Sequence, residues 1–136
     1  MVQNNIRPRI MICEDEPMIA MDIAAIVTEC GCEAVGPFAS GREALSALRK
    51  QRIDAAILDI DLADGASTPL ARTLREQGVA MIVLSGLALS SPPPEFAGVE
   101  WLTKPVDEKR LQAFCCRAHF PVERRTLREP ALPPAI

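Results

Sequence analysis

Apolar and polar residues alternate along the chain in blocks of two kinds. Short apolar runs of the kind found in buried parallel strands occupy residues 9–13, 32–38, 54–59, 79–84 and 99–103. Most of the segments between them place apolar residues every three or four positions, which is the spacing of an amphipathic helix. The pattern therefore predicts strands and helices in turn over most of the chain.

Capping residues mark the ends of the predicted helices. Serine, threonine and aspartate stabilise the first turn through their side-chain oxygens, proline suits the first helical position, and glycine follows the last turn. A serine followed three residues later by a glutamate has the spacing of a capping box. The signals, in chain order, are Pro17, Gly31, the Ser40 and Glu43 pair, Thr68-Pro69 and Asp107.

Two segments depart from this alternation. Residues 61–67 are polar or small, and they predict a loop. Residues 87–97 contain the run Pro92-Pro93-Pro94, which cannot lie inside a helix because each proline lacks a donor and clashes with the preceding turn. We expect at most one helical turn near residues 94–97, where the alternation would otherwise place a fourth helix.

The order of elements predicts an α/β fold with three layers. It is a doubly wound, five-stranded parallel sheet of order 2-1-3-4-5, with helices on both faces and right-handed crossovers. We expect a flexible segment at residues 1–8, the domain at 9–119, and a tail with prolines and arginines at 120–136. Too few residues follow His119 for a second core, so the sequence predicts a domain that stands alone.

Composition narrows the function classes. The net charge is −3 and the pI is about 5.2, which argues against a nucleic-acid-binding surface. No apolar run approaches the length of a membrane span, and residues 1–9 lack the apolar stretch of a signal peptide. These features predict a cytoplasmic protein that contacts neither nucleic acid nor membrane.

The number and spacing of the cysteines indicate that they pack in the core and do not bind metal or act in redox chemistry. Their number is odd, no Cys-x-x-Cys occurs, and His119 is the only histidine, so a zinc site of the usual type is not expected. We interpret all of them as reduced, buried thiols: Cys13, Cys30, Cys32, Cys115 and Cys116.

Acidic residues stand where two neighbouring strands end. The first strand runs into Glu14 and Asp15, and the third ends in Asp59. In the order 2-1-3-4-5 these strand ends are adjacent, and carboxylates held so close repel one another unless a cation lies among them. Mg²⁺ suits such an oxygen-only site. Ser85 and Lys104 follow the fourth and fifth strands, and they offer a hydroxyl and a positive charge to a phosphoryl group.

This constellation resembles the receiver domain of bacterial two-component response regulators, in particular the stand-alone, chemotaxis-regulator-like type. The resemblance covers residues 9–119 and implies a flavodoxin-like fold, here with a reduced fourth helix. It rests on these residues: Glu14-Asp15, Leu58-Asp59-Ile60-Asp61-Leu62, Leu84-Ser85-Gly86 and Lys104-Pro105.

The resemblance also implies roles for these residues. Asp59 is then the phosphoacceptor, and Mg²⁺ is held by Asp15, by Glu14 through water, by Asp59 and by the backbone carbonyl of Asp61. Ser85 and Lys104 bind the phosphoryl group, Trp101 stands at the position of the aromatic switch residue, and a cis peptide bond is expected between Lys104 and Pro105.

Partners follow from the same resemblance. A sensor histidine kinase or a phosphotransfer protein would donate the phosphoryl group, and an unnamed downstream protein would read the phosphorylated state. The chain is expected to be a monomer, or a weak dimer through the face formed by strands 79–84 and 99–103 and the last helix.

Two other functions stay open on the sequence. The run Asp59-Ile60-Asp61 begins like the motif of haloacid-dehalogenase phosphatases, although Ala63 stands where that motif has threonine or valine. A receiver-like module could also bind partners without phosphorylation. The hypothesis that the sequence favours is that the chain is a phosphoacceptor, which catalyses at most its own phosphorylation and dephosphorylation.

Overall fold

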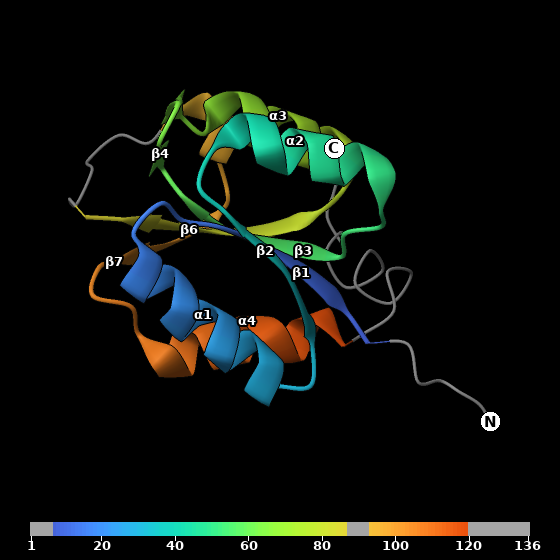
Figure 1. Cartoon of the computed structure of the whole chain (residues 1–136), viewed down its shortest axis with the longest axis vertical. Helices are drawn as coiled ribbons and strands as arrows, with labels where there is room; N and C mark the ends of the chain where they lie inside the picture. The colour runs from blue at the N-terminus through green and yellow to red at the C-terminus, as the bar shows by residue number, and fades with distance from the viewer. Residues whose placement is uncertain (1–6, 87–92, 120–136) are drawn as a thin grey trace, which may run out of the picture.

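The computed structural model describes residues 7–86 and 93–119 and has three layers (Figure 1). A five-stranded parallel sheet forms the middle layer, in the order β2-β1-β3-β6-β7. The strands are β1 (Arg9–Cys13), β2 (Glu33–Phe38), β3 (Ala55–Asp59), β6 (Ala80–Ser85) and β7 (Glu100–Thr103). This is the order that the sequence predicts, and the fold class is confirmed.

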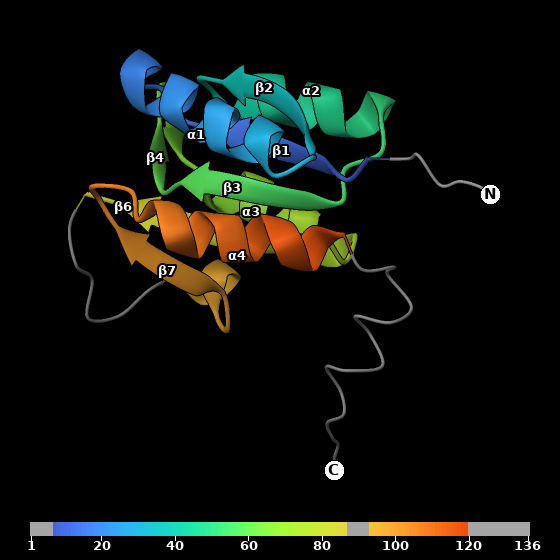
Figure 2. The same cartoon turned by 90° about the horizontal axis from the view of Figure 1, so that it is seen from below.

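Helices cover both faces of the sheet. One face carries α1 (Pro17–Glu29) and α4 (Glu108–Ala118), which lie side by side in Figures 1 and 2. The opposite face carries α2 (Gly41–Lys50) and α3 (Thr68–Glu76). Both ends of a parallel sheet remain uncovered in such an arrangement, so residues at the carboxyl ends of the strands stay accessible.

The central strand β3 shows how the sequence pattern produces these layers. All its residues are buried, because helices cover both of its faces. Ala56 and Leu58 belong to the core beneath α2 and α3, whereas Ala55 and Ile57 belong to the core beneath α1 and α4. The continuous apolar run therefore supplies both cores, and Asp59 ends it as a buried acidic residue.

Two of the predicted caps are present and one is displaced. The Ser40 hydroxyl accepts from the Glu43 amide at 3.2 Å, and the Asp107 carboxylate accepts from the Arg110 amide at 3.2 Å. At α3 the N-cap residue is Ser67 rather than the expected Thr68, which is already the first helical residue. Ser67 is fully buried, and its amide and hydroxyl both donate to the carbonyl of Ile60.

The segment predicted as a loop contains a small hairpin. Strands β4 (Asp61–Leu62) and β5 (Gly65–Ala66) pair antiparallel directly after β3. The Ala63 amide donates to the carbonyl of Ala39 at 2.9 Å, which fastens this hairpin to the chain before α2. Strands of two residues are too short to show a period in the sequence.

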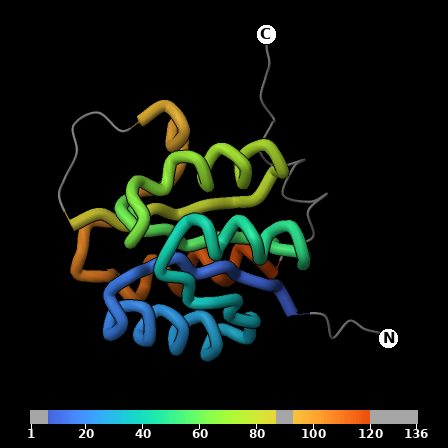
Figure 3. The backbone as a smooth tube through the Cα atoms, turned by 45° about the horizontal axis from the view of Figure 1, so that its top comes forward, coloured from blue at the N-terminus to red at the C-terminus, as the bar shows by residue number. Residues whose placement is uncertain are grey.

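Within residues 93–99 the chain forms one 3-10 turn, η1 (Pro94–Phe96), which lies beside α3 (Figure 3). Phe96 is fully buried in the core, and Arg75 of α3 donates to the carbonyl of Ala97 at 2.8 Å. The prediction of at most one helical turn here is confirmed. The rest of that prediction falls on residues 87–92, which lie outside the described residues, as do 1–6 and 120–136 of the expected terminal segments.

The cysteines are free thiols, but not all are buried. Cys13, Cys32 and Cys115 are buried, Cys30 is half-buried and Cys116 is exposed, which corrects the expectation for the last two. Burial raises the pKa of Cys32 to about 11 and that of Cys115 to about 12. These thiols are therefore protonated near neutral pH and serve as packing groups. Within the described residues, no helix has the length and apolar character to cross a membrane.

Gly36 in β2 is the glycine at which a side chain would cost most. Its φ is +106°, and an added Cβ would lie 2.9 Å from the backbone oxygen of Ile12 and from the amide nitrogen of Phe38. We expect Gly36→Ala to lower the free energy of unfolding by about 3 kcal/mol, because backbone strain and overlap add. Urea denaturation measures this.

Gly65 provides the matched control. Its φ is +123°, but an added Cβ would meet nothing within 4 Å. Gly65→Ala should therefore cost only the strain, roughly 1–2 kcal/mol. Equal losses in the two variants would contradict the close approach between β2 and β1.

Candidate functional site

Three carboxylates converge at the carboxyl ends of β1 and β3. The strand register pairs Cys13 with Leu58, so the next residues, Glu14 and Asp59, emerge side by side. One carboxylate oxygen from each of Glu14, Asp15 and Asp59 lies within 4.8 Å of the other two. The sequence predicts this cluster from strand order alone. Glu14 and Asp59 are buried, whereas Asp15 is exposed to solvent.

Lys104 reaches this cluster from the far edge of the sheet. Its amide donates to the carbonyl of Ser85 at 2.8 Å, which continues the pairing of β6 with β7 to the position of the lysine. Its Nζ lies 2.7 Å from Asp59 Oδ2 and 2.9 Å from Glu14 Oε1. One ammonium therefore neutralises one of two buried carboxylates, and the site keeps a net negative charge.

Burial and charge act against each other in this site. Burial is the largest influence on Glu14 and raises the pKa of its carboxyl, although hydrogen bonds from Lys104 and from the Glu16 amide oppose this. Partial burial of Lys104 favours its neutral form, but its hydrogen bonds to Asp59 and Glu14 outweigh that effect and raise its pKa. Lys104 is therefore charged at neutral pH, and it stabilises both carboxylates.

One carboxylate oxygen of Glu14 receives no hydrogen bond within the described part of the chain. Oε2 accepts from the Glu16 amide at 3.1 Å and from Lys104 Nζ at 3.2 Å. Oε1 is buried and lies 2.9 Å from Lys104 Nζ in an ion pair, but it accepts no hydrogen bond from the residues that the structure describes. A buried carboxylate oxygen that makes no hydrogen bond is costly, and the ion pair with Lys104 offsets only part of that cost. The three carboxylates, the Glu14 oxygen among them, fit a hard divalent cation such as Mg²⁺.

Asp61 contributes its backbone rather than its side chain. Its amide donates to Asp59 Oδ1 at 3.2 Å, and its carboxylate is exposed and does not belong to the acidic cluster. One carboxylate oxygen of Asp59 therefore accepts from the Asp61 amide, and the other accepts from Lys104 Nζ. The predicted metal contact through the Asp61 carbonyl stays a prediction.

The residues that the sequence assigns to phosphoryl binding and to the switch lie on or directly after β6 and β7. Ser85 is buried at the end of β6, in register with Thr103. Trp101 is half-buried on the α2 and α3 face, and its ring lies edge-on to Phe96 with 5.7 Å between centroids and an interplanar angle of 76°. The Lys104–Pro105 peptide bond is cis. Their roles in a switch stay predictions.

Sequence reasoning missed two features here. The direct ion pair between Glu14 and Lys104 joins positions 90 residues apart, and no local pattern signals it. The cis peptide bond between Gly36 and Pro37 was also not predicted; the only local signal is the glycine-proline pair itself.

Comparison with protein families gives a match to the response regulator receiver domain over residues 10–115. Among curated proteins, the transcriptional regulatory protein TcrA of Mycobacterium tuberculosis is 34% identical over 122 residues, covering 83% of this chain and 48% of its own length. The phyllosphere-induced regulator PhyR of Methylorubrum extorquens is 31% identical over 117 residues, covering 82% of this chain and 43% of its own length. The chain thus spans less than half the length of these relatives.

Solved structures give the same fold. A CheY-like receiver domain protein of Methanospirillum hungatei superimposes with a TM-score of 0.76 at 22% identity, covering 90% of this chain and 99% of that one. The regulator PhyR of Brucella abortus superimposes with a TM-score of 0.73 at 28% identity, covering 93% of this chain and 53% of that one.

Proposed function

The chain belongs to the response regulator receiver domain family, and on this basis we propose that it is a signalling module switched by phosphorylation of Asp59. One observation carries the proposal: the carboxylates of Glu14, Asp15 and Asp59 lie together with Lys104 Nζ 2.7 Å from Asp59. The arrangement provides a nucleophilic oxygen, ligands for a cation, and a positive charge for the incoming phosphoryl group.

The proposed donor is a phosphohistidine of a sensor histidine kinase or phosphotransfer protein. An Asp59 oxygen attacks phosphorus, the O–P bond forms as the N–P bond breaks, and the released imidazole takes up a proton. Lys104 stays beside the acceptor and offsets the charge that the phosphoryl oxygens bring. Exposed Met18 and Met21 of α1, near Asp15 in the chain, offer the donor an apolar contact surface.

Mg²⁺ is the proposed cofactor. When bound, the ion neutralises the carboxylates and polarises the phosphoryl group. In the chain itself, Asp15 provides the exposed carboxylate, Glu14 provides a buried carboxylate oxygen that makes no hydrogen bond with the described residues, and Asp59 is the acceptor that both flank. Ser85, buried at the end of the next strand, is proposed to donate its hydroxyl to a phosphoryl oxygen.

The proposal is tested by incubating the protein with a small phosphodonor, such as acetyl phosphate, with and without Mg²⁺. Mass spectrometry should show a single added phosphoryl group that mild base removes, as an acyl phosphate requires, and chelation should prevent its formation. No incorporation under these conditions would favour the alternative, a receiver-like module that binds partners without phosphorylation.

Metal binding gives an independent prediction. We expect Asp15→Asn to weaken Mg²⁺ at least about tenfold, because the ion loses a charged ligand, and Glu14→Gln to weaken it less, because Lys104 already competes for that carboxylate. Isothermal titration calorimetry measures both. Asp22→Asn on the exposed side of α1 is the control and should leave the affinity unchanged. An Mg²⁺ affinity of Asp15→Asn equal to that of the wild type would contradict the proposed site.

A Mg²⁺-dependent phosphatase is the less favoured candidate. That chemistry would use the second aspartate of Asp59-Ile60-Asp61 as a proton donor within the site. The Asp61 carboxylate is instead exposed and outside the cluster. The proposal therefore assigns no reaction beyond the chain's own phosphorylation and dephosphorylation. A weak dimer through β6, β7 and α4 stays a prediction.

A further inference from the structure

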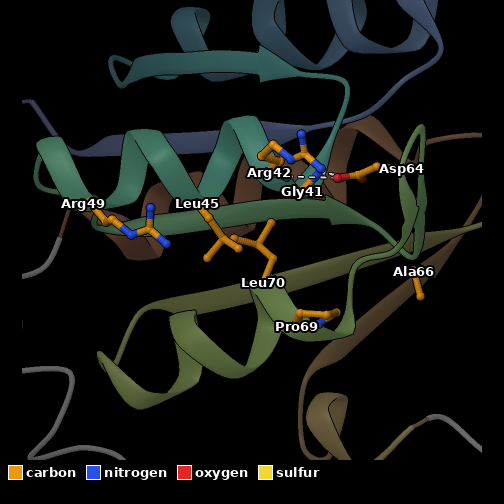
Figure 4. Close-up of a pocket in the computed structure, with 8 residues that line it drawn as sticks. All are labelled: Gly41, Arg42, Leu45, Arg49, Asp64, Ala66, Pro69 and Leu70. Carbon is orange, nitrogen blue, oxygen red and sulfur yellow. Dashed lines mark hydrogen bonds between the residues drawn. The ribbon is translucent and has the colours of Figure 1, made fainter.

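A groove of about 300 Å³ lies between α2 and α3, on the opposite face of the sheet from α1 and α4 (Figure 4). Leu45 and Leu70 point toward one another and give it an apolar floor, while Ala66 of the β4–β5 hairpin lines one end. Arg42 and Arg49 stand along its α2 side. None of these residues belongs to the acidic site.

The arginines along this groove differ from those of the neighbouring helix. On α3, Arg72 forms an ion pair with Glu95 at 3.1 Å, and Arg75 donates to backbone carbonyls. The guanidinium groups of Arg42 and Arg49 form no salt bridge to any of the residues that the structure covers. A chain of net charge −3 therefore presents a local positive rim here.

Asp64 does not fully cancel this charge. Its carboxylate accepts from the Gly41 amide at 2.8 Å and from the Arg42 amide at 3.1 Å, drawn as dashed lines in Figure 4. These bonds, and to a smaller extent the charge of Arg42, hold its pKa below the usual range, so Asp64 offsets part of the positive charge at the Arg42 end. The Arg49 end of the groove has no such acidic neighbour among the lining residues.

We propose that this groove binds an acidic, extended segment of a partner protein, in which carboxylates flank an aliphatic residue. The aliphatic side chain would lie on Leu45 and Leu70, and the carboxylates would meet Arg42 and Arg49. Seven helical residues separate the arginines by about 10.5 Å along the axis, and three residues of extended chain span about 10 Å. The inference goes beyond the proposed function and does not depend on it.

The chain's own tail does not fit this occupant. Residues 120–136 contain three arginines and two glutamates, so they bring no excess of negative charge to a basic rim. A free inorganic anion also fits poorly, because the floor between the arginines is apolar and offers it no donor. An acidic segment with an aliphatic centre matches both the charge and the floor.

The test uses an array of short synthetic peptides in which two glutamates at varied spacing flank a leucine. Glutamine versions of the same peptides control for charge. Fluorescence anisotropy with the full chain should give binding that peaks at one spacing and is lost with glutamine. Absence of binding across the array would overturn the inference. Binding of inorganic phosphate or pyrophosphate that displaces the peptide equally well would also overturn it, in favour of a small-anion site.

Charge-reversal variants locate the binding. Arg49→Glu should weaken the best peptide at least tenfold, by replacing an attractive charge with a repulsive one. Lys50→Glu makes the same change one residue along α2, at an exposed position outside the groove, and should stay within about twofold. Circular dichroism melting checks that both variants fold. Equal losses in the two variants would show long-range attraction rather than a groove, and would overturn the inference.

Discussion

Replacing Asp59 with asparagine is expected to abolish phosphoryl incorporation from a small phosphodonor. The amide lacks the anionic oxygen that attacks phosphorus. Glu14 cannot substitute, because its side chain is fully buried. Asp15 cannot substitute either, because Lys104 forms its ion pairs with Glu14 and Asp59 and not with Asp15. Intact-protein mass spectrometry of wild type and variant, with Mg²⁺ present, measures the difference.

Asp61→Asn is the matched control for this experiment. It makes the same chemical change two residues along the chain, at an exposed carboxylate outside the cluster, and labelling should persist. Reduction of the acyl phosphate with borohydride, followed by peptide sequencing, locates the modified residue in the wild type. A phosphoryl group on Asp61, or continued labelling of Asp59→Asn, would contradict the assignment of the acceptor.

The fold was predictable because its strands are buried on both faces. A parallel strand covered by helices on each side is a continuous apolar run, and such runs stand out at residues 54–59 and 79–84 even without periodicity. Helix ends were predictable where a side chain makes the cap, as at Ser40 and Asp107. At α3 the prediction was off by one residue, because Ser67 and Thr68 are equally suited to a cap and tertiary contacts to Ile60 decide between them.

The sequence predicted which residues stand at the strand ends of the site, but it did not predict the contacts between their side chains. Strand order places Glu14 and Asp59 together, since the residues before them, Cys13 and Leu58, pair in the sheet. Which carboxylate oxygen Lys104 meets depends on side-chain geometry across three strands, and the sequence holds no local signal for it. The groove beside α2 was not predicted either. It depends on how the β4–β5 hairpin closes one end, and that hairpin is too short to leave a pattern.

Lys104→Met is expected to lower the free energy of unfolding by about 3 kcal/mol without Mg²⁺. The lysine side chain is 19% exposed, and its partners Glu14 and Asp59 are 0% and 9% exposed. Removing the ammonium leaves two carboxylates buried without a counterion, which is the costly way to break such a pair. Methionine keeps an aliphatic stem of similar length, so lost packing adds little. Urea denaturation in a chelating buffer measures the change.

Lys104→Met also tests whether bound Mg²⁺ can replace the lysine charge, and Lys109→Met is its control. Lys109→Met removes an exposed lysine of α4 that forms no salt bridge among the described residues, and it should stay within about 0.5 kcal/mol of wild type. Mg²⁺ should restore more stability to Lys104→Met than to wild type, because the ion then supplies the only positive charge among the carboxylates. If Lys104→Met were as stable as Lys109→Met, or indifferent to Mg²⁺, the carboxylates would not depend on Lys104 as the structure implies.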